Sequence, residues 1–398
     1  MSLSGRRIVL SLSIVLIPNA CESRGEPSEQ PFLVAPGPEA PPGWNVQELA
    51  CIGSVDGPDE ESSFGSIRGI ELDAEGNVYV LDTQATTVRV FASDGRYLRS
   101  IGREGGGPGE FKRPTGIVLT PDGRLWVANP GNRRYDVFER DGTLAGTYRK
   151  TVRAGFMGRW DAVATEDGVI YEPHITLVDG GTEQHQVFTG FVPKSGSAEL
   201  VDVVQRDAPA PPPFWPVRAG TAGGGVYEAG IVPVPFASAL HDRFDSRRGY
   251  WTATTDQVRF IRRSPEGDTL LVVERAVAPR PVTDEDIDTA IRDLRARFEE
   301  GLQVDRSMVP STMPYWEVFL VDDAGRLWVQ QFEYYSGSAT RPATWEIYDT
   351  NGVLLGELTL PVANNPLPIV RHNRLAGVFR DEFEVEYVVL YDLGVPMG

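Results

Sequence analysis

A pair of tight turns that recurs at a fixed interval is the feature of this sequence that most constrains its fold. Residues 68–82 (RGIELDAEGNVYVLD) match residues 115–129 (TGIVLTPDGRLWVAN), and the turn glycines Gly76 and Gly123 stand 47 residues apart. The glycine that ends the second turn of each unit recurs at the same interval. Tight hairpins need positive-φ positions, which Gly tolerates. Each unit is therefore predicted to contain four strands, as in a propeller blade.

Four further units follow at looser spacing. They include residues 164–171, 246–254, 322–330 and 371–379. The sixth unit has no room for its outermost strand, which residues 44–53 (WNVQELACIG) can supply from the other end of the chain. Closing the ring in this way removes the exposed sheet edge of an open array. We therefore expect an all-β fold over residues 44–398, a six-bladed β-propeller whose last blade is closed by an N-terminal strand.

The junction between the first two units resembles a known family. Residues 102–111 (GREGGGPGEF) and 113–119 (RPTGIVL) resemble the blade junction of NHL-type repeats and of bacterial six-bladed propeller lipoproteins. The resemblance is strongest over residues 64–150 and moderate over residues 312–360. It implies the propeller fold and a cell-envelope location, but it does not imply an activity, since this fold hosts enzymes and binding proteins alike.

The first 21 residues are typical of an export signal. Arg6 and Arg7 precede an apolar stretch that is too short to span a bilayer, and Ala20 places a small residue before Cys21. This arrangement resembles a bacterial lipoprotein signal, which implies that Cys21 is lipidated and anchors an exported chain to a membrane, in the periplasm or at the cell surface. Ordinary signal cleavage and an uncleaved anchor are the alternatives.

The chain has one other cysteine, Cys51. If Cys21 is acylated, Cys51 is a lone thiol; the alternative is a Cys21–Cys51 disulfide that pins the tail. Residues 22–43 contain six prolines among polar and small residues, which predicts a semi-extended linker. The formal net charge of −18 argues against nucleic acid as a partner, because Lys and Arg must neutralise its phosphates.

Catalytic signals are sparse, so we expect binding rather than catalysis, with no cofactor and no metal. The four histidines show no metal-ligand spacing. They are His174, His185, His241 and His372. Lactonase-like propellers bind calcium through Glu, Asn and Asp side chains on inner strands, and Glu71, Asn129 and Asp82 are of these types. Nothing completes the set, however, and Asp82 and Asn129 occupy a repeat position where such side chains cap turns.

Four lengthened segments belong to the two loop classes that open on one face of a propeller, here called the top face. Residues 206–234 join blades three and four, and residues 278–312 join blades four and five. The middle loops of blade three (179–183) and blade five (334–342) are lengthened too. Loops on a rigid scaffold usually carry binding, so this face is the predicted binding face, with random drift in loop length as the alternative.

The second of these insertions contains the one predicted helix, over residues 283–302, with Thr283 as its N-cap. Its apolar stripe consists of Ile287, Ile291, Leu294, Phe298 and Leu302. The stripe either packs on the propeller's own top face or forms a lid or a docking surface for a partner. Nearby aromatic residues could line a pocket under the helix or form its seat. They are Phe214, Trp215, Tyr315, Trp316, Tyr334 and Tyr335.

Arg68, Arg113 and Arg159 each stand at the start of an inner strand, and the repeat places them near the top mouth of the channel. They would attract an anion there, unless each pairs with a neighbouring acid such as Glu110 or Asp161. We therefore expect a non-catalytic binding or scaffold propeller with a small anionic ligand or a protein or peptide partner. The first alternative is an NHL-like metal-dependent hydrolase or lyase with its site at the central channel. The second is a structural partner in an outer-membrane complex, marked by an exposed helix stripe.

Overall fold

A computed structural model describes most of the propeller region. It covers residues 40–53, 60–150, 160–178, 183–194, 197–207, 212–220, 226–298, 301–335 and 339–395. Cys21, Arg159 and nearly all of the predicted linker lie outside the described residues, so the predictions made for them stay predictions. No helix in the described part is long and apolar enough to cross a membrane.

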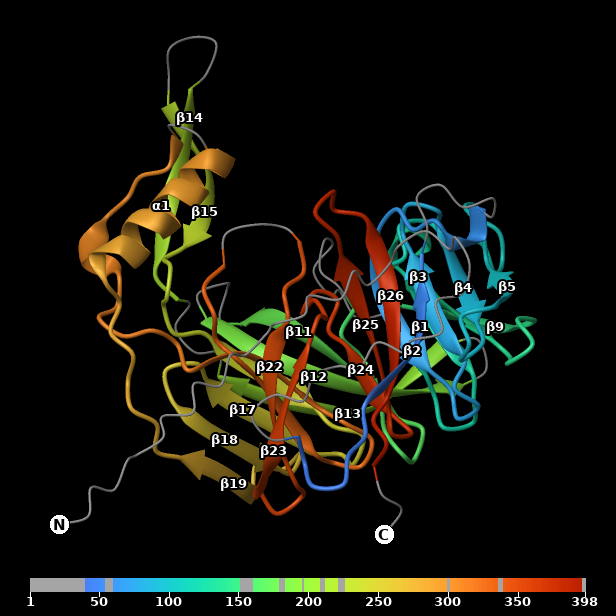
Figure 1. Cartoon of the computed structure of the whole chain (residues 1–398). Helices are drawn as coiled ribbons and strands as arrows, with labels where there is room; N and C mark the ends of the chain where they lie inside the picture. Colours follow the sequence, from blue (N-terminus) through green and yellow to red (C-terminus); the bar gives the residue numbers. More distant parts are fainter. Residues whose placement is uncertain are drawn as a thin grey trace, which may run out of the picture.

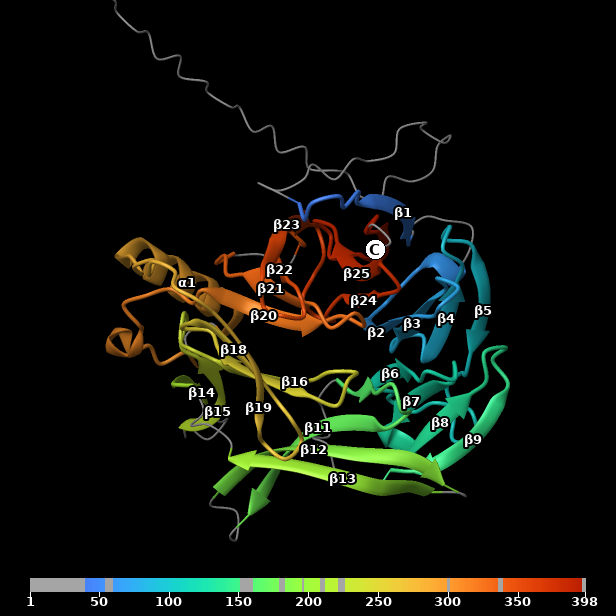
Figure 2. The same cartoon turned by 90° about the horizontal axis from the view of Figure 1, so that it is seen from below.

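Six four-stranded antiparallel blades surround a central channel (Figure 2). Blade one contains β2 (Ile67–Leu72), β3 (Val78–Asp82), β4 (Thr87–Phe91) and β5 (Tyr97–Ile101), and blade two contains β6 (Gly116–Leu119), β7 (Leu125–Asn129), β8 (Arg134–Phe138) and β9 (Leu144–Arg149). Blade three contains β10 (Val163–Ala164), β11 (Ile170–Val178), β12 (Glu183–Lys194) and β13 (Ser197–Asp207), and blade four contains β16 (Leu240–Phe244), β17 (Tyr250–Thr254), β18 (Val258–Arg263) and β19 (Thr269–Arg275). Blade five contains β20 (Trp316–Val321), β21 (Leu327–Gln331), β22 (Ala343–Tyr348) and β23 (Leu354–Leu360), and blade six contains β24 (Ile369–Arg371), β25 (Arg374–Arg380), β26 (Glu386–Asp392) and β1 (Gln47–Ile52).

The ring closes through blade six, whose outermost strand comes from the N-terminal side of the chain. β1 pairs antiparallel with β26, from Gln47 opposite Asp392 to Ile52 opposite Val388. Ala50 and Ile52 of β1 are buried in the apolar cluster between blades six and one. The predicted closure by residues 44–53 is therefore confirmed.

Each pair of adjacent blades shares one buried apolar cluster, so six clusters form a closed cycle around the channel. Alternation along the strands sends apolar side chains to both faces of every blade, where they meet those of its two neighbours. Trp126 belongs to the cluster between blades two and three, and Trp345 to the cluster between blades five and six. Both indoles are buried.

The turn between the first two strands of a blade explains the repeat seen in the sequence. Gly76 and Gly123 have φ angles of 88° and 84°, which side chains rarely adopt. The residue before each turn binds the turn's own groups: the Asp73 carboxylate accepts a hydrogen bond from the Asn77 amide, and the Thr120 hydroxyl donates to the Arg124 carbonyl. Side-chain chemistry and backbone freedom therefore specify the same hairpin.

The insertions differ from the predicted loops. The 206–234 segment contains a hairpin of β14 (Phe214–Gly220) and β15 (Val226–Pro233), which the sequence did not predict because Pro216 and a run of glycines interrupt its strand pattern. In blade three the extra residues continue as strand: β11 and β12 remain paired from Ile170–Phe191 to Val178–Glu183. The predicted middle loop is thus shortened to four residues, which lie outside the described part.

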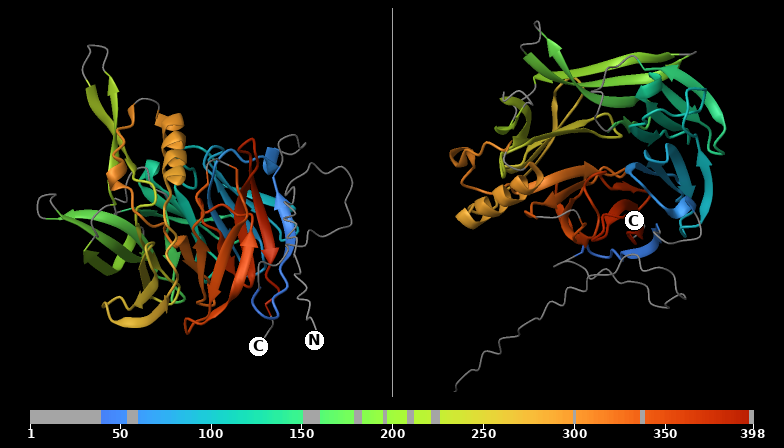
Figure 3. Two further views of the ribbon diagram at one scale, coloured as in Figure 1. Left: turned by 60° about the vertical axis from the view of Figure 1, so that its left-hand side comes forward. Right: turned by 90° about the horizontal axis from the view of Figure 1, so that it is seen from above.

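The predicted helix exists as α1 (Asp284–Phe298), shorter than the expected 283–302. Thr283 caps it as predicted, since its hydroxyl accepts from the Asp286 amide at 3.2 Å. α1 lies against β14 and β15 beside the ring, as Figures 1 and 3 show. We call β14, β15, α1 and residues 301–309 the insertion module.

Candidate functional site

The predicted top-face arginines are exposed where the structure describes them. Arg68 lies at the start of β2, remote from the β2–β3 turn, and Arg113 lies before β6 with a φ angle of 53°. Glu110, one of the suggested partners, binds Arg103 at 2.8 Å. Arg159 lies outside the described residues, so the proposed convergence of three arginines is not tested.

The predicted aromatic residues occupy separate settings and do not line one pocket in the described part. Trp215 is in the core of the insertion module, while the Trp316 indole is buried between blades four and five and donates to the Gln257 carbonyl. Tyr315 donates to the Val277 carbonyl, and the Arg341 guanidinium lies 3.7 Å from the Tyr335 ring centroid. Tyr334 contacts α1 from blade five, with its hydroxyl 2.9 Å from Asp293 Oδ2.

The apolar stripe of α1 is covered by the other insertion rather than by the top face of the ring. It packs against Trp215, Val232 and Val234 in a cluster separate from the six clusters of the ring. The Trp215 indole donates to the Asp305 carbonyl at 3.0 Å, which ties β14 to the segment after α1. Phe298, at the end of the stripe, is 40% exposed. The stripe is therefore mainly the internal contact of the module.

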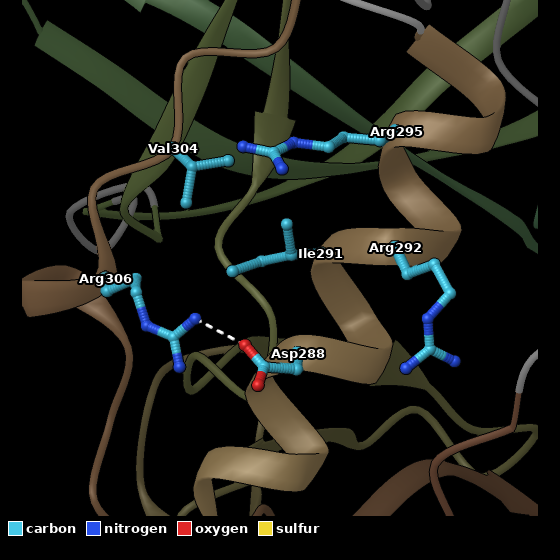
Figure 4. A pocket seen from close by; sticks show the side chains of 6 residues that line it. All are labelled: Asp288, Ile291, Arg292, Arg295, Val304 and Arg306. Atoms are coloured by element: carbon cyan, nitrogen blue, oxygen red, sulfur yellow. Dashed lines mark hydrogen bonds and ion pairs between the residues drawn. The ribbon is translucent and has the colours of Figure 1, made fainter.

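A groove of about 420 Å³ lies between α1 and the segment that follows it. Six residues line it, namely Asp288, Ile291, Arg292, Arg295, Val304 and Arg306. Figure 4 shows Arg295 and Ile291 directed from α1 toward Val304 and Arg306, whereas the Arg292 side chain turns to the other flank of the helix. Arg306 binds Asp288 at 2.5 Å, and this hydrogen bond raises the pKa of Arg306.

Asp82 and Asn129, the calcium-type residues considered above, cap backbone turns. Asp82 accepts hydrogen bonds from the amides of Gly65, Ser66, Gln84 and Ala85. Asn129 Oδ1 accepts from the Lys112 amide, and its Nδ2 donates to the Glu110 carbonyl. Within the described ranges, no group of three or more His, Cys, Asp or Glu side chains is arranged to hold a metal ion.

The described histidines stand apart from one another. His241 packs edge-on against Trp316, and burial together with nearby Arg243 lowers its pKa to about 4. Burial also lowers the pKa of His174. His372, in the β24–β25 turn, is partly exposed beside Asp323. The side chain of His185 lies outside the described part.

A buried carboxylate at the junction of blades two and three was missed by sequence reasoning. Glu172 pairs with Lys150 and accepts hydrogen bonds from the Tyr135 hydroxyl and, at 2.7 Å, from the Trp160 indole. Burial lowers the pKa of Lys150 and raises that of Tyr135. One carboxylate oxygen binds Lys150, and the other binds both Tyr135 of blade two and Trp160, which precedes blade three. The network therefore links the two blades at their junction.

An ion pair that the sequence also did not predict lies at the end of the channel opposite the insertion module. Arg371, the last residue of β24, places Nη1 2.8 Å from Oε2 of Glu71 on β2. The two groups are close enough to form an ion pair. Their geometry does not make a hydrogen bond, however, and Oε2 accepts none from the described residues. Glu71 is 4% exposed, and this burial, only partly offset by Arg371 and the Leu119 amide, raises its pKa to about 7.

Beside this pair a cavity of about 270 Å³ opens on the channel axis. It lies at the face that carries the inner turns, which are the turns between the first two strands of each blade. Every blade contributes to its wall. The polar lining residues are Asp73, Thr120, Arg140, Glu166, Ser246, Asp323, Arg371 and His372. We call this cavity the turn-side mouth.

The closed ring of six four-stranded blades defines the chain as a six-bladed β-propeller. A family model described as "6-bladed beta-propeller" matches residues 59–128. The mouse NHL-repeat-containing protein 4 is 30% identical over 131 residues, which are 29% of this chain and 88% of that protein. The chain belongs to the NHL-repeat-containing proteins.

Mouse NHL repeat-containing protein 3 is 26% identical over 157 residues, and the matched part spans only 42% of that protein's length. Among solved structures, virginiamycin B lyase from Staphylococcus aureus aligns over 88% of this chain and 99% of its own, at 11% identity and a TM-score of 0.43. A gluconolactonase from Xanthomonas campestris aligns over 92% and 99%, at 13% identity and a TM-score of 0.36. At these scores neither likeness carries an argument about activity.

Proposed function

We propose that this chain is a non-catalytic binding propeller of the cell envelope that holds a carboxylate-bearing ligand on the insertion module. The observation that carries the proposal is the groove beside α1, where Arg295 and Arg306 face each other across Ile291 (Figure 4). The formal net charge of the chain is −18, so a cavity lined by three arginines and one aspartate is a local exception.

The geometry suits a planar anion. A guanidinium donates two parallel hydrogen bonds to a carboxylate, and Ile291 offers apolar contact to the carbon atoms of a ligand. Asp288 competes for Arg306, with which it forms a 2.5 Å ion pair. Because Arg306 is about half exposed, each arginine is expected to contribute at the modest level of solvent-exposed pairs, and its loss should weaken Kd roughly fivefold.

Calorimetric titration of short peptides tests the groove. A peptide with a free C-terminal carboxylate should bind, and its amidated form should bind more weakly. Arg295→Ala and Arg306→Ala should each weaken binding, whereas Asp288→Asn should strengthen it by releasing Arg306. Arg259→Ala is the matched control, because Arg259 forms a similar exposed ion pair with Glu274 on blade four.

Equal binding by all four variants would rule out the groove. The same titrations with Arg68→Ala and Arg113→Ala decide whether the ligand lies instead at the top mouth of the channel, as the sequence suggested.

The envelope location depends on Cys21. Cys51 is disulfide-bonded, and the only other cysteine of the chain, Cys21, lies outside the described residues. Acylation of Cys21 and a Cys21–Cys51 bridge exclude each other, because both use the same sulfur. Cys21→Ala should release the protein from membranes if the sulfur is acylated. A mature N-terminus with a free or bridged cysteine, found by mass spectrometry, would contradict lipidation.

A metal-dependent hydrolase or lyase at the central channel is the alternative function. The observation that favours an enzyme is the raised pKa of Glu71 beside the turn-side mouth, since a carboxyl with a pKa near 7 can act as a general base. The test is hydrolysis of lactone and ester substrates with added calcium or zinc, comparing wild type with Glu71→Gln. Turnover that is lost in the variant would establish the enzyme and displace the binding proposal.

A further inference from the structure

Blade six breaks the rule that the other blades follow at the inner turn. In blades one to five the residue before the turn is Asp or Thr, and it binds groups of its own turn. These residues are Asp73, Thr120, Thr165, Asp245 and Asp322. In blade six this position holds Arg371, and the turn consists of two residues, His372 and Asn373, with φ angles of 53° and 57°. Such a turn needs no side-chain cap, so Arg371 has no role in its own turn.

Arg371 instead reaches across the channel end to blades one and two. Its Nη1 lies 2.8 Å from Glu71 and 3.5 Å from the Leu119 carbonyl. The repeat position of Glu71 is apolar in four of the other blades, where it is occupied by Val118, Val163, Leu320 and Ile369. A buried ion pair seldom stabilises a protein more than apolar residues in its place would. Packing therefore does not account for the pair.

The pair borders the turn-side mouth, where hydrogen-bond donors and acceptors alternate. Each rim charge already has a counterpart: Glu166 lies 3.6 Å from Arg247, Asp323 accepts from the His372 amide at 2.9 Å, and Arg140 lies 2.7 Å from Glu75. Three carboxylates and two arginines line the cavity, so an anion gains no net attraction there. A cation would meet the guanidinium of Arg371. An uncharged ligand whose groups both donate and accept hydrogen bonds is complementary to this wall.

We propose that the turn-side mouth binds a small neutral polyhydroxylated molecule, with Arg371 as the principal donor and the rim carboxylates as acceptors. The volume of about 270 Å³ lies just below the range of pockets for drug-sized ligands, which sets the size near that of a monosaccharide. Hydroxyl groups can accept from Arg371 and donate to Asp323 or Glu166 at the same time. This site is separate from the groove beside α1, at the other end of the channel.

Methyl NMR titration of the intact wild-type protein locates the ligand. The methyl groups of Ala74, Leu119 and Ala164 line the cavity and serve as reporters. Glucose, myo-inositol and glycerol are the neutral probes, succinate and inorganic phosphate are the anionic probes, and putrescine is the cationic probe. We expect at least one neutral probe to shift the three reporters and to leave those of the insertion module unchanged. Reporters that respond only to the charged probes, or to none, would overturn the proposal.

Variants test the role of Arg371. Arg371→Met should weaken binding of the responding probe about tenfold. Arg374→Met in the same hairpin should not, because it removes only a surface hydrogen bond to the Glu75 carbonyl of blade one. The double variant Glu71→Leu with Arg371→Met leaves no buried charge unpaired, and it should fold and fail to bind. Wild-type affinity in the double variant would overturn the proposal. Arg295→Ala is expected to leave this binding unchanged.

Discussion

The ring and the insertion module bury their apolar side chains in different ways. Each blade shares both of its faces with neighbours, so the six clusters of the ring depend on one another. The module instead encloses one cluster around Trp215, built from two insertions and anchored to blade five through the contact of Tyr334 with Asp293. This difference implies that the module can loosen while the ring stays closed. The ring, in contrast, cannot lose a strand locally.

Deletion of residues 1–53 is expected to have the largest effect, because it removes β1 from the ring. The buried side chains of Ala50 and Ile52 are lost, and β26 is left with an unpaired edge. For a domain of ordinary stability, roughly 5–15 kcal/mol, this brings the ring close to unfolding or to association through the edge. Calorimetry and light scattering would show it. A monomeric truncation with an unchanged melting temperature would contradict the role of β1.

Trp215→Ala should destabilise the module by about 3–5 kcal/mol, as expected for removal of a buried indole. Hydrogen exchange should then accelerate in β14, β15 and α1 and remain slow in the ring. Trp345→Ala is the matched substitution in the ring, where an equally buried indole is lost and the whole ring should become less stable. If each substitution accelerated hydrogen exchange equally in the module and in the ring, the two would unfold as one unit.

Glu71→Gln should change how the stability of the ring depends on pH. The pKa of Glu71 is about 7 in the folded protein against 4.5 as its ordinary value, so the folded state holds the proton more tightly. The contribution of this carboxyl is complete below pH 4.5 and is lost as the pH rises to about 7. The free energy of unfolding of wild type, relative to Glu71→Gln, should fall by roughly 3 kcal/mol across this window. Chemical denaturation of wild type and Glu71→Gln at a series of pH values measures this difference, and an equal pH dependence of the two proteins would contradict the prediction.

Tyr334→Phe should have the smallest effect. The hydroxyl loses a partly exposed hydrogen bond to Asp293, which contributes about 0.5 kcal/mol. Exchange of α1 amides should accelerate by no more than a few fold, and the melting temperature of the ring should not change. A clear drop in ring stability would mean that the module supports the ring through blade five.

The ring could be predicted because its signals are local and repeated. Turn glycines such as Gly76 and Gly123, together with strand alternation, specify each blade, and a count of the strands revealed that the last one had to come from residues 44–53. Thr283 and the apolar stripe also predicted α1. The partner of that stripe could not be predicted, because it comes from the other insertion, in which Pro216 and glycines obscure the hairpin.

The pair of Glu71 and Arg371 was missed for a different reason. The two residues are 300 positions apart, and only the closed ring brings them together. A signal was nevertheless present, since Arg371 stands where every other blade has Asp or Thr. The repeat reveals the number of blades. A residue that departs from the repeat, such as Arg371, is one that does not stabilise the turn of its own blade. The groove arginines offered no such contrast, because they lie on α1 and on the segment that follows it, in an insertion outside the repeat.

The pairing of β1 with β26 also sets an order on folding. The first strand of the chain cannot complete its ladder until the last strand has been synthesised, since Gln47 lies opposite Asp392. During synthesis the earlier blades can stack on one another, but β1 has no partner, and contacts this distant in sequence form slowly. Residues 40–53 should therefore be the most accessible to proteases in a nascent chain that stops before β26. Their protection would report the moment at which the ring closes.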